Sequence, residues 1–171
     1  MRMSGRSPTR SSGDTGHVSA TVSDLWPQPV GGWPEWVWTV PYVGAYHPAA
    51  GSLPTINNGA NCQRYAYAVL ALFELAVPPL RSSNLWEEQA LTRPVAPDHL
   101  AALDLVLFNA DAESWGAHVG VFMAPNQVLH LCQEVGTPAV WTWGDFAARP
   151  EYATFLGAKR VSAQTGPAPR R

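Results

Sequence analysis

Cysteine is scarce in this 171-residue chain, which contains only Cys62 and Cys132. Two cysteines exclude the dense disulfide framework of small secreted domains, so we expect each to be a free thiol. An excess of charge of one sign is also lacking, because the net charge is -2 at pH 7. This balance gives no electrostatic basis for a nucleic-acid partner or for binding to an acidic membrane surface.

Long apolar runs are missing as well. No stretch reaches the ~18 residues of a membrane-spanning helix, and the first two dozen residues contain no apolar segment of the secretory-signal kind. The sequence therefore predicts no membrane insertion and a cytoplasmic location. A glycine-rich phosphate loop and a dinucleotide fingerprint are absent too, so the common nucleotide-binding motifs are not found.

The residues that are present suit one folded domain between two tails. Hydrophobic residues make up 46% of the chain and charged residues 14%, which is enough apolar surface for a sizeable core. Residues 1–23 are rich in Ser, Thr, Gly and Arg, and residues 163–171 end in Gly, Pro and Arg. Such segments bury too little to offset their ordering entropy, so we predict two disordered tails around a single domain at 24–162.

The predicted elements are a helix followed by strands, which indicates an α+β fold. Apolar residues recur at helical spacing from Cys62, Asn61 is a good N-cap, and Pro78 and Pro79 stop the helix. Pro125-Asn126 is turn chemistry between two apolar runs and predicts an antiparallel hairpin. The expected strands are 103–109, 118–124, 127–132, 139–142 and 154–161, the expected short helices are 85–90 and 146–149, and the Trp-rich stretch 35–40 is expected to be a strand or extended arm.

Cys62 is the residue with the clearest chemical potential. A thiol in the first turn of a helix feels the positive end of the macrodipole, and backbone N–H groups point outward there. This placement favours the thiolate, and the same N–H groups are suited to stabilising an oxyanion during acyl transfer. The alternative is an inert cysteine that packs as a small apolar residue.

Two histidines of the predicted hairpin complete a plausible catalytic set with Cys62. His118 opens the first strand, after a run of small residues, and His130 lies on the neighbouring strand. A histidine at a strand end can face a helix that packs across the sheet. The ring of His130 is then placed to bind the outer nitrogen of His118 and to fix its tautomer.

Three sequence blocks resemble those of the NlpC family of papain-like cysteine peptidases, with some similarity to the CHAP amidases. The blocks are NGANCQRYAYAVLALF, LDLVLF and HVGVFMAPNQVLHL. The resemblance implies a papain-like α+β fold, Cys62 as nucleophile, His118 as general base and acid, and His130 as the orienting third residue. It implies no cofactor and no metal, and a small peptide or amide as the substrate partner, with peptidoglycan-derived peptides as one class.

The substrate-binding residues are less well marked. The family often has a tyrosine beside the nucleophile, for which Tyr42 is the nearer match and Tyr46 the alternative. Gln63 follows the cysteine where the family usually has Ser, and we expect it to shape the cleft rim. Trp115, in the loop before His118, is a further substrate-binding candidate.

Three other interpretations remain open at this stage. Cys132 and His130 are two residues apart and face the same side of a strand, so with Cys62 and His118 they would supply four zinc ligands. A non-catalytic binding module on the same fold is a second alternative. Acyl transfer to an amine is a third, because it proceeds through the same acyl-enzyme.

Overall fold

The structure, a computed structural model, describes residues 24–163 of the chain. The tails predicted at 1–23 and 163–171 therefore fall outside the described residues, except for Ala163. The helices are α1 (Trp36–Thr39), α2 (Cys62–Ala71), α3 (Ser82–Glu87) and α4 (Trp143–Ala147), with 3-10 turns η1 (Ile56–Asn58), η2 (Pro97–His99) and η3 (Pro150–Tyr152). The strands are β1 (Thr92–Val95), β2 (Leu105–Asn109), β3 (His118–Ala124), β4 (Gln127–Leu131), β5 (Pro138–Trp141) and β6 (Thr154–Val161).

The strands form a six-stranded sheet in the order β1-β6-β2-β3-β4-β5, and every pairing in it is antiparallel. The α+β prediction is confirmed. The predicted hairpin is β3 and β4, and Asn126 takes a positive φ of 58° in its turn. Asparagine tolerates this left-handed conformation better than most residues, which explains its use there.

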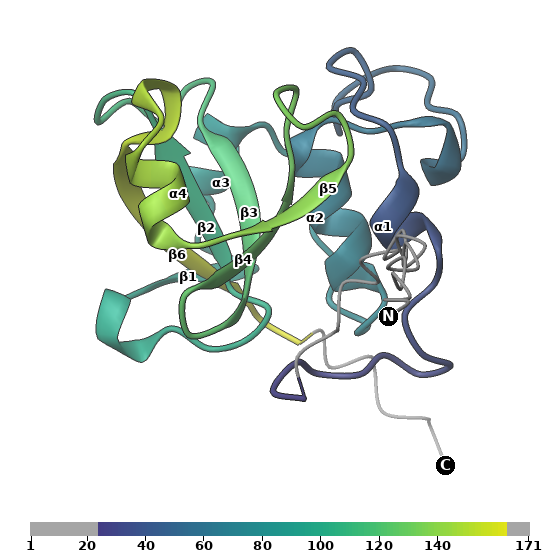
Figure 1. Cartoon of the computed structure of the whole chain (residues 1–171), viewed down its shortest axis with the longest axis horizontal. Coiled ribbons are helices and arrows are strands. Elements are labelled where there is room, and N and C mark those ends of the chain that lie inside the picture. The colour runs from purple at the N-terminus through teal and green to yellow at the C-terminus, as the bar shows by residue number, and fades with distance from the viewer. Residues whose placement is uncertain (1–23, 164–171) are drawn as a thin grey trace, which may run out of the picture.

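Alternation along the central strands buries both faces of the sheet. One face packs against α1 and α2, and α4 lies on the other side (Figure 1). Val119 and Val121 belong to the core on the α2 side, whereas Phe122 and Val128 belong to the core on the α4 side. The α4-side core also contains Phe146, and its ring stacks on Phe108 at a centroid distance of 4.0 Å.

Four elements differ from the sequence prediction. Residues 36–39 form the single helical turn α1 instead of a strand, and the hydroxyl of Tyr65 donates to the Val37 carbonyl within it. The helix expected at 85–90 lies earlier, as α3, and the one expected at 146–149 is α4, capped by Thr142. Strand β1 was not predicted because it contains Pro94, which is tolerated there since β1 is an edge strand.

Within residues 24–163, none of the helices combines the length and the apolar character that a membrane span requires.

Candidate active site

The start of α2 is built by the loop that precedes it. Gly59 has φ +131°, and a Cβ there would lie 2.5 Å from Cγ2 of Val43, so glycine is required. Asn61 then caps the helix, because its side-chain oxygen accepts the backbone N–H of Arg64 at 2.9 Å. The cap makes Cys62 the first residue of α2, as the sequence predicted.

The two residues after Cys62 support this loop. Gln63 is buried, and its side-chain oxygen accepts a hydrogen bond from Asn61 at 3.4 Å. The guanidinium of Arg64 donates to the carbonyls of Gly59 and Pro54. The expectation that Gln63 shapes the cleft rim does not fit this burial.

The Cys62 thiol lies where α2 meets β3. Backbone N–H groups of Val119, Gln63 and Cys62 itself face the sulfur and lower its pKa, but burial has the larger effect and raises it. The expectation that a helix start favours the thiolate is therefore corrected: desolvation outweighs the backbone N–H groups, and the free thiol is favoured.

His118 and His130 lie side by side on β3 and β4. The Nε2 atom of His118 and the Nδ1 atom of His130 are 3.0 Å apart and share a hydrogen bond. Gly120, on β3, leaves room for the β4 side chains, because a Cβ there would lie 2.6 Å from Cγ1 of Val128 and 3.4 Å from Cβ of His130. Glycine in the HVG sequence thus lets the two rings meet.

Aromatic side chains from residues 138–152 surround the two histidines. The ring of Tyr152 is 4.9 Å from that of His118, and Trp141 and Phe146 are 4.2 Å and 5.0 Å from that of His130, measured between centroids. Burial lowers the pKa of His118 to about 3 and that of His130 to about 2, with the charges of His118 and Arg149 adding to the effect on His130. Both imidazoles are therefore neutral near pH 7.

The beginning of β3 carries both a backbone contact of the thiol and one of the two histidines. The N–H that faces the sulfur belongs to Val119, the residue after His118. Because Nε2 of His118 is used by His130, Nδ1 is the ring nitrogen of His118 left for a reaction partner. A neutral histidine with one nitrogen bound by a second residue has its other nitrogen available to accept a proton.

The remaining predicted substrate residues occupy different places. Tyr42 pairs with Ala60 in an isolated bridge, and the charge of ionised Cys62 is one cause of its raised pKa, after burial. Tyr46 instead interacts electrostatically with Arg64. Trp115 is 79% exposed and lines a cavity of about 350 Å³. The structure thus brings Tyr42 into electrostatic range of the thiol, and the Tyr46 carbonyl accepts the backbone N–H of Asn61 at 3.1 Å, one residue before Cys62.

Sequence reasoning missed Arg81 and Tyr152. Arg81 lines the cavity at Trp115, and its positive charge lowers the pKa of both Cys62 and Tyr42. Tyr152 interacts with Cys62 and with Tyr42, whose charges contribute to its raised pKa after burial and Cys132. Neither residue is singled out by a local sequence signal that connects it with Cys62.

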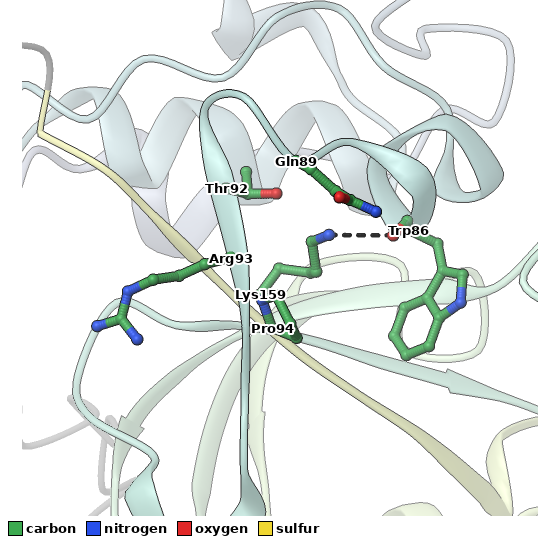
Figure 2. Close-up of a pocket in the computed structure, with 6 residues that line it drawn as sticks. All are labelled: Trp86, Gln89, Thr92, Arg93, Pro94 and Lys159. Atoms are coloured by element: carbon green, nitrogen blue, oxygen red, sulfur yellow. Dashed lines mark hydrogen bonds between the residues drawn. The ribbon is translucent and has the colours of Figure 1, made fainter.

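A larger cavity of about 450 Å³ lies elsewhere, between α3 and the β1 edge (Figure 2). Lys159 reaches into this region from β6, and its ammonium donates to the carbonyls of Trp86 and Glu88 at 3.0 Å and 2.6 Å. Lysine thereby caps the C-terminal end of α3. Neither Cys62 nor the histidine pair lines this cavity.

The zinc alternative finds no support in the geometry. Cys132 is buried at the end of β4. Within the described part of the chain, no group of three or more His, Cys, Asp or Glu side chains is arranged to hold a metal ion.

Comparisons with known proteins give a fold. No family model matches the chain, and no curated protein matches it either. Among solved structures it is similar to an NlpC/P60 family protein from Bacillus cereus ATCC 10987, with a TM-score of 0.54 and 18% identity over 72% of this chain and 36% of that one. It is also similar to NlpC1 from Trichomonas vaginalis, with a TM-score of 0.51 and 13% identity over 74% of this chain and 41% of that one.

The chain thus spans less than half the length of either relative. Identities below 20% carry information about architecture only. The order of a cysteine-bearing helix before an antiparallel sheet agrees with this match. The chain has the papain-like α+β fold of NlpC/P60 proteins.

Proposed function

We propose that the protein is a cysteine-dependent hydrolase of amide or peptide bonds, with Cys62 as nucleophile, His118 as general base and acid, and His130 as the orienting residue. The observation that carries the proposal is the Cys62 sulfur against the N–H of Val119, the residue that directly follows His118, whose ring His130 holds by a 3.0 Å hydrogen bond.

The reaction begins from a neutral thiol and a neutral imidazole. As the sulfur attacks the carbonyl carbon, the thiol proton passes to Nδ1 of His118, and backbone N–H groups at the start of α2 stabilise the oxyanion. Protonated His118 then gives this proton to the leaving amine as the C–N bond breaks. Water, deprotonated by His118, attacks the thioester, and the acid is released with the free thiol.

The surroundings of the thiol favour a substrate with an acidic group. Arg81 and the exposed ring of Trp115 line the same cavity, and the charge of Arg81 reaches the thiol. A guanidinium binds carboxylates in a bidentate manner, and an indole offers an apolar platform beside it. Peptidoglycan-derived peptides, which carry free carboxylates, are the substrate class we favour.

The test is turnover of a set of peptidoglycan-derived peptides, followed by mass spectrometry. We expect a cleaved amide bond with the wild type and with Cys132→Ser, and loss of cleavage by at least about 10³-fold with Cys62→Ala. Added glycinamide detects acyl transfer as a new amide product. Cleavage that persists in Cys62→Ala would refute the mechanism.

A further inference from the structure

The second nitrogen of His130 is unusual because nothing hydrogen-bonds to it. His130 is completely buried, and its Nδ1 is bound to His118. Its Nε2 atom is buried without a hydrogen-bond partner in residues 24–163. Buried polar atoms are nearly always partnered, so an unpartnered one in this position asks for a physical explanation.

A single proton in the histidine hydrogen bond allows two arrangements of the neutral pair. In the first, His118 donates from Nε2, so His130 carries its own proton on Nε2 and His118 presents a bare Nδ1. In the second, His130 donates from Nδ1, so its Nε2 is bare and His118 carries its proton on Nδ1. The two arrangements differ at Nδ1 of His118, the ring nitrogen that His130 leaves free, and only the first can accept a proton there.

The aromatic rings around His130 distinguish the two arrangements. Its ring meets that of Trp141 edge to face, at a centroid distance of 4.2 Å and an angle of 61°, and lies 5.0 Å from Phe146. The face of an aromatic ring is electronegative, so it attracts an N–H and repels a lone pair. An indole offers the most favourable face of the natural side chains.

The positive charge of Arg149 does not reverse the preference for a proton on Nε2 of His130. The guanidinium carbon of Arg149 lies 3.9 Å from the Trp141 ring centroid, and its charge opposes protonation of His130. Glu134, however, binds Arg149 through two hydrogen bonds of 2.7 Å and 2.8 Å and compensates that charge. Arg149 therefore holds Trp141 in place more than it acts on the histidine.

We propose that Trp141 is a positioning residue that receives the Nε2–H of His130 on its aromatic face and thereby sets the first arrangement of the histidine pair. The orphaned nitrogen then has a weak partner. His118 holds its proton on Nε2 and keeps Nδ1 unprotonated, so that Nδ1 is able to take the Cys62 proton in the proposed reaction. This consequence for catalysis rests on the proposed function, whereas the location of the protons does not.

The test is the tautomeric state of both histidines in the full-length protein. Selective ¹⁵N-histidine labelling and long-range ¹H–¹⁵N correlation spectra near pH 7 identify which nitrogen carries the proton. We expect Nε2–H for both His118 and His130. We also expect the His130 N–H proton to be shifted upfield by the Trp141 ring and to show a nuclear Overhauser effect to it. A proton on Nδ1 of His130, or an N–H without these two signs, overturns the proposal.

Two variants of Trp141 separate the effect of its aromatic face from the effect of its size. Trp141→Phe keeps an aromatic face and should keep both Nε2–H tautomers. Trp141→Leu removes the face, so the ratio of the second arrangement to the first should rise by about threefold to tenfold, and the alkylation rate of Cys62 should fall in proportion to the population that the first arrangement loses. Unchanged tautomers in a folded Trp141→Leu protein contradict the role of Trp141. If that variant does not fold, the wild-type proton shift and Overhauser effect decide. Protein that hydrolyses no peptide but shows these signals would refute the function and leave the tautomer assignment intact.

Discussion

At Cys62, two opposing effects act on one proton. The helix start supplies backbone N–H groups that favour the thiolate, and the charge of Arg81 adds to them, but burial favours the thiol more strongly. The histidine pair offers no compensating charge, because burial keeps both rings neutral. Both the thiol and the imidazoles are thus neutral at rest, and in the mechanism we propose, proton transfer accompanies attack on the substrate instead of preceding it.

This balance predicts the pH dependence of Cys62 alkylation. In a Cys132→Ser protein, the rate with iodoacetamide should keep rising with pH and level off only above pH 9, because burial raises the pKa of the Cys62 thiol above its ordinary value. A rate already constant by about pH 7 would instead reveal a thiolate–imidazolium pair. The measurement is the rate of mass increase over a pH series.

The matched control is the Cys62→Ser protein, which leaves Cys132 as the single thiol. Cys132 is 1% exposed, whereas Cys62 keeps partial exposure. Cys132 should therefore react at least about tenfold more slowly at each pH in the folded protein. Equal rates for the two thiols would argue that Cys62 is a buried packing residue and would count against the hydrolase proposal.

On the scale of elements, α2 and the loop before it fix where the thiol lies. The Asn61 side chain accepts the Arg64 N–H, and its amide donates to Gln63. Replacing an N-cap asparagine by alanine leaves a backbone N–H unpaired, and such caps contribute about 1 kcal/mol. Asn61→Ala should therefore lower the free energy of unfolding by about that amount.

The measurement for this prediction is urea unfolding followed by tryptophan fluorescence. Asn61→Ser is the control, because serine is as good an N-cap as asparagine. It should recover most of the loss. A Ser variant as unstable as the Ala variant would mean that Asn61 acts through packing or through Gln63, and not as a cap.

The elements that sequence reasoning predicted well are those with local signals. Strand β3 begins and ends as predicted, at His118 and Ala124, since it is continuously apolar and followed by a Pro-Asn turn. Helix α2 begins as predicted but ends at Ala71, several residues before the prolines. Residues 36–39 misled the prediction, because aromatic and β-branched residues favour strands while tertiary contacts, such as Tyr65 with Val37, decide the outcome.

The cover over the histidine pair could not be predicted in the same way. Trp141, Phe146 and Tyr152 come from β5, α4 and η3, and only the folded chain brings them onto His118 and His130. The pairing of the histidines, in contrast, followed from strand register, because His118 and His130 lie on adjacent strands of one hairpin. Local patterns thus predicted that the two histidines meet, whereas the long-range packing of aromatic side chains determines their protonation.

For the whole molecule, this packing couples stability to pH. Both histidines have a folded-state pKa below the ordinary 6.5, at about 3 and about 2. The unfolded chain therefore binds two more protons than the folded chain once the pH falls below 6.5, and stability declines as pH decreases. Carboxylates whose pKa is lowered, such as Glu88, begin to contribute only below their ordinary value of 4.5. Between pH 6.5 and 4.5, the loss in the free energy of unfolding therefore comes from the histidines.

Between pH 7 and pH 5, linkage gives a loss of about 2 kcal/mol in the free energy of unfolding for each histidine that must stay neutral. Urea unfolding at the two pH values should show about twice this loss in the wild type, which has two such histidines. His130→Gln cannot bind the second proton, so its loss should be about half of the wild-type loss. Because each variant is compared with itself at two pH values, a general destabilisation by His130→Gln cancels. If the wild type and His130→Gln lose the same free energy, His130 is not held neutral by its aromatic surroundings, and the protonation scheme proposed for the active site fails with it.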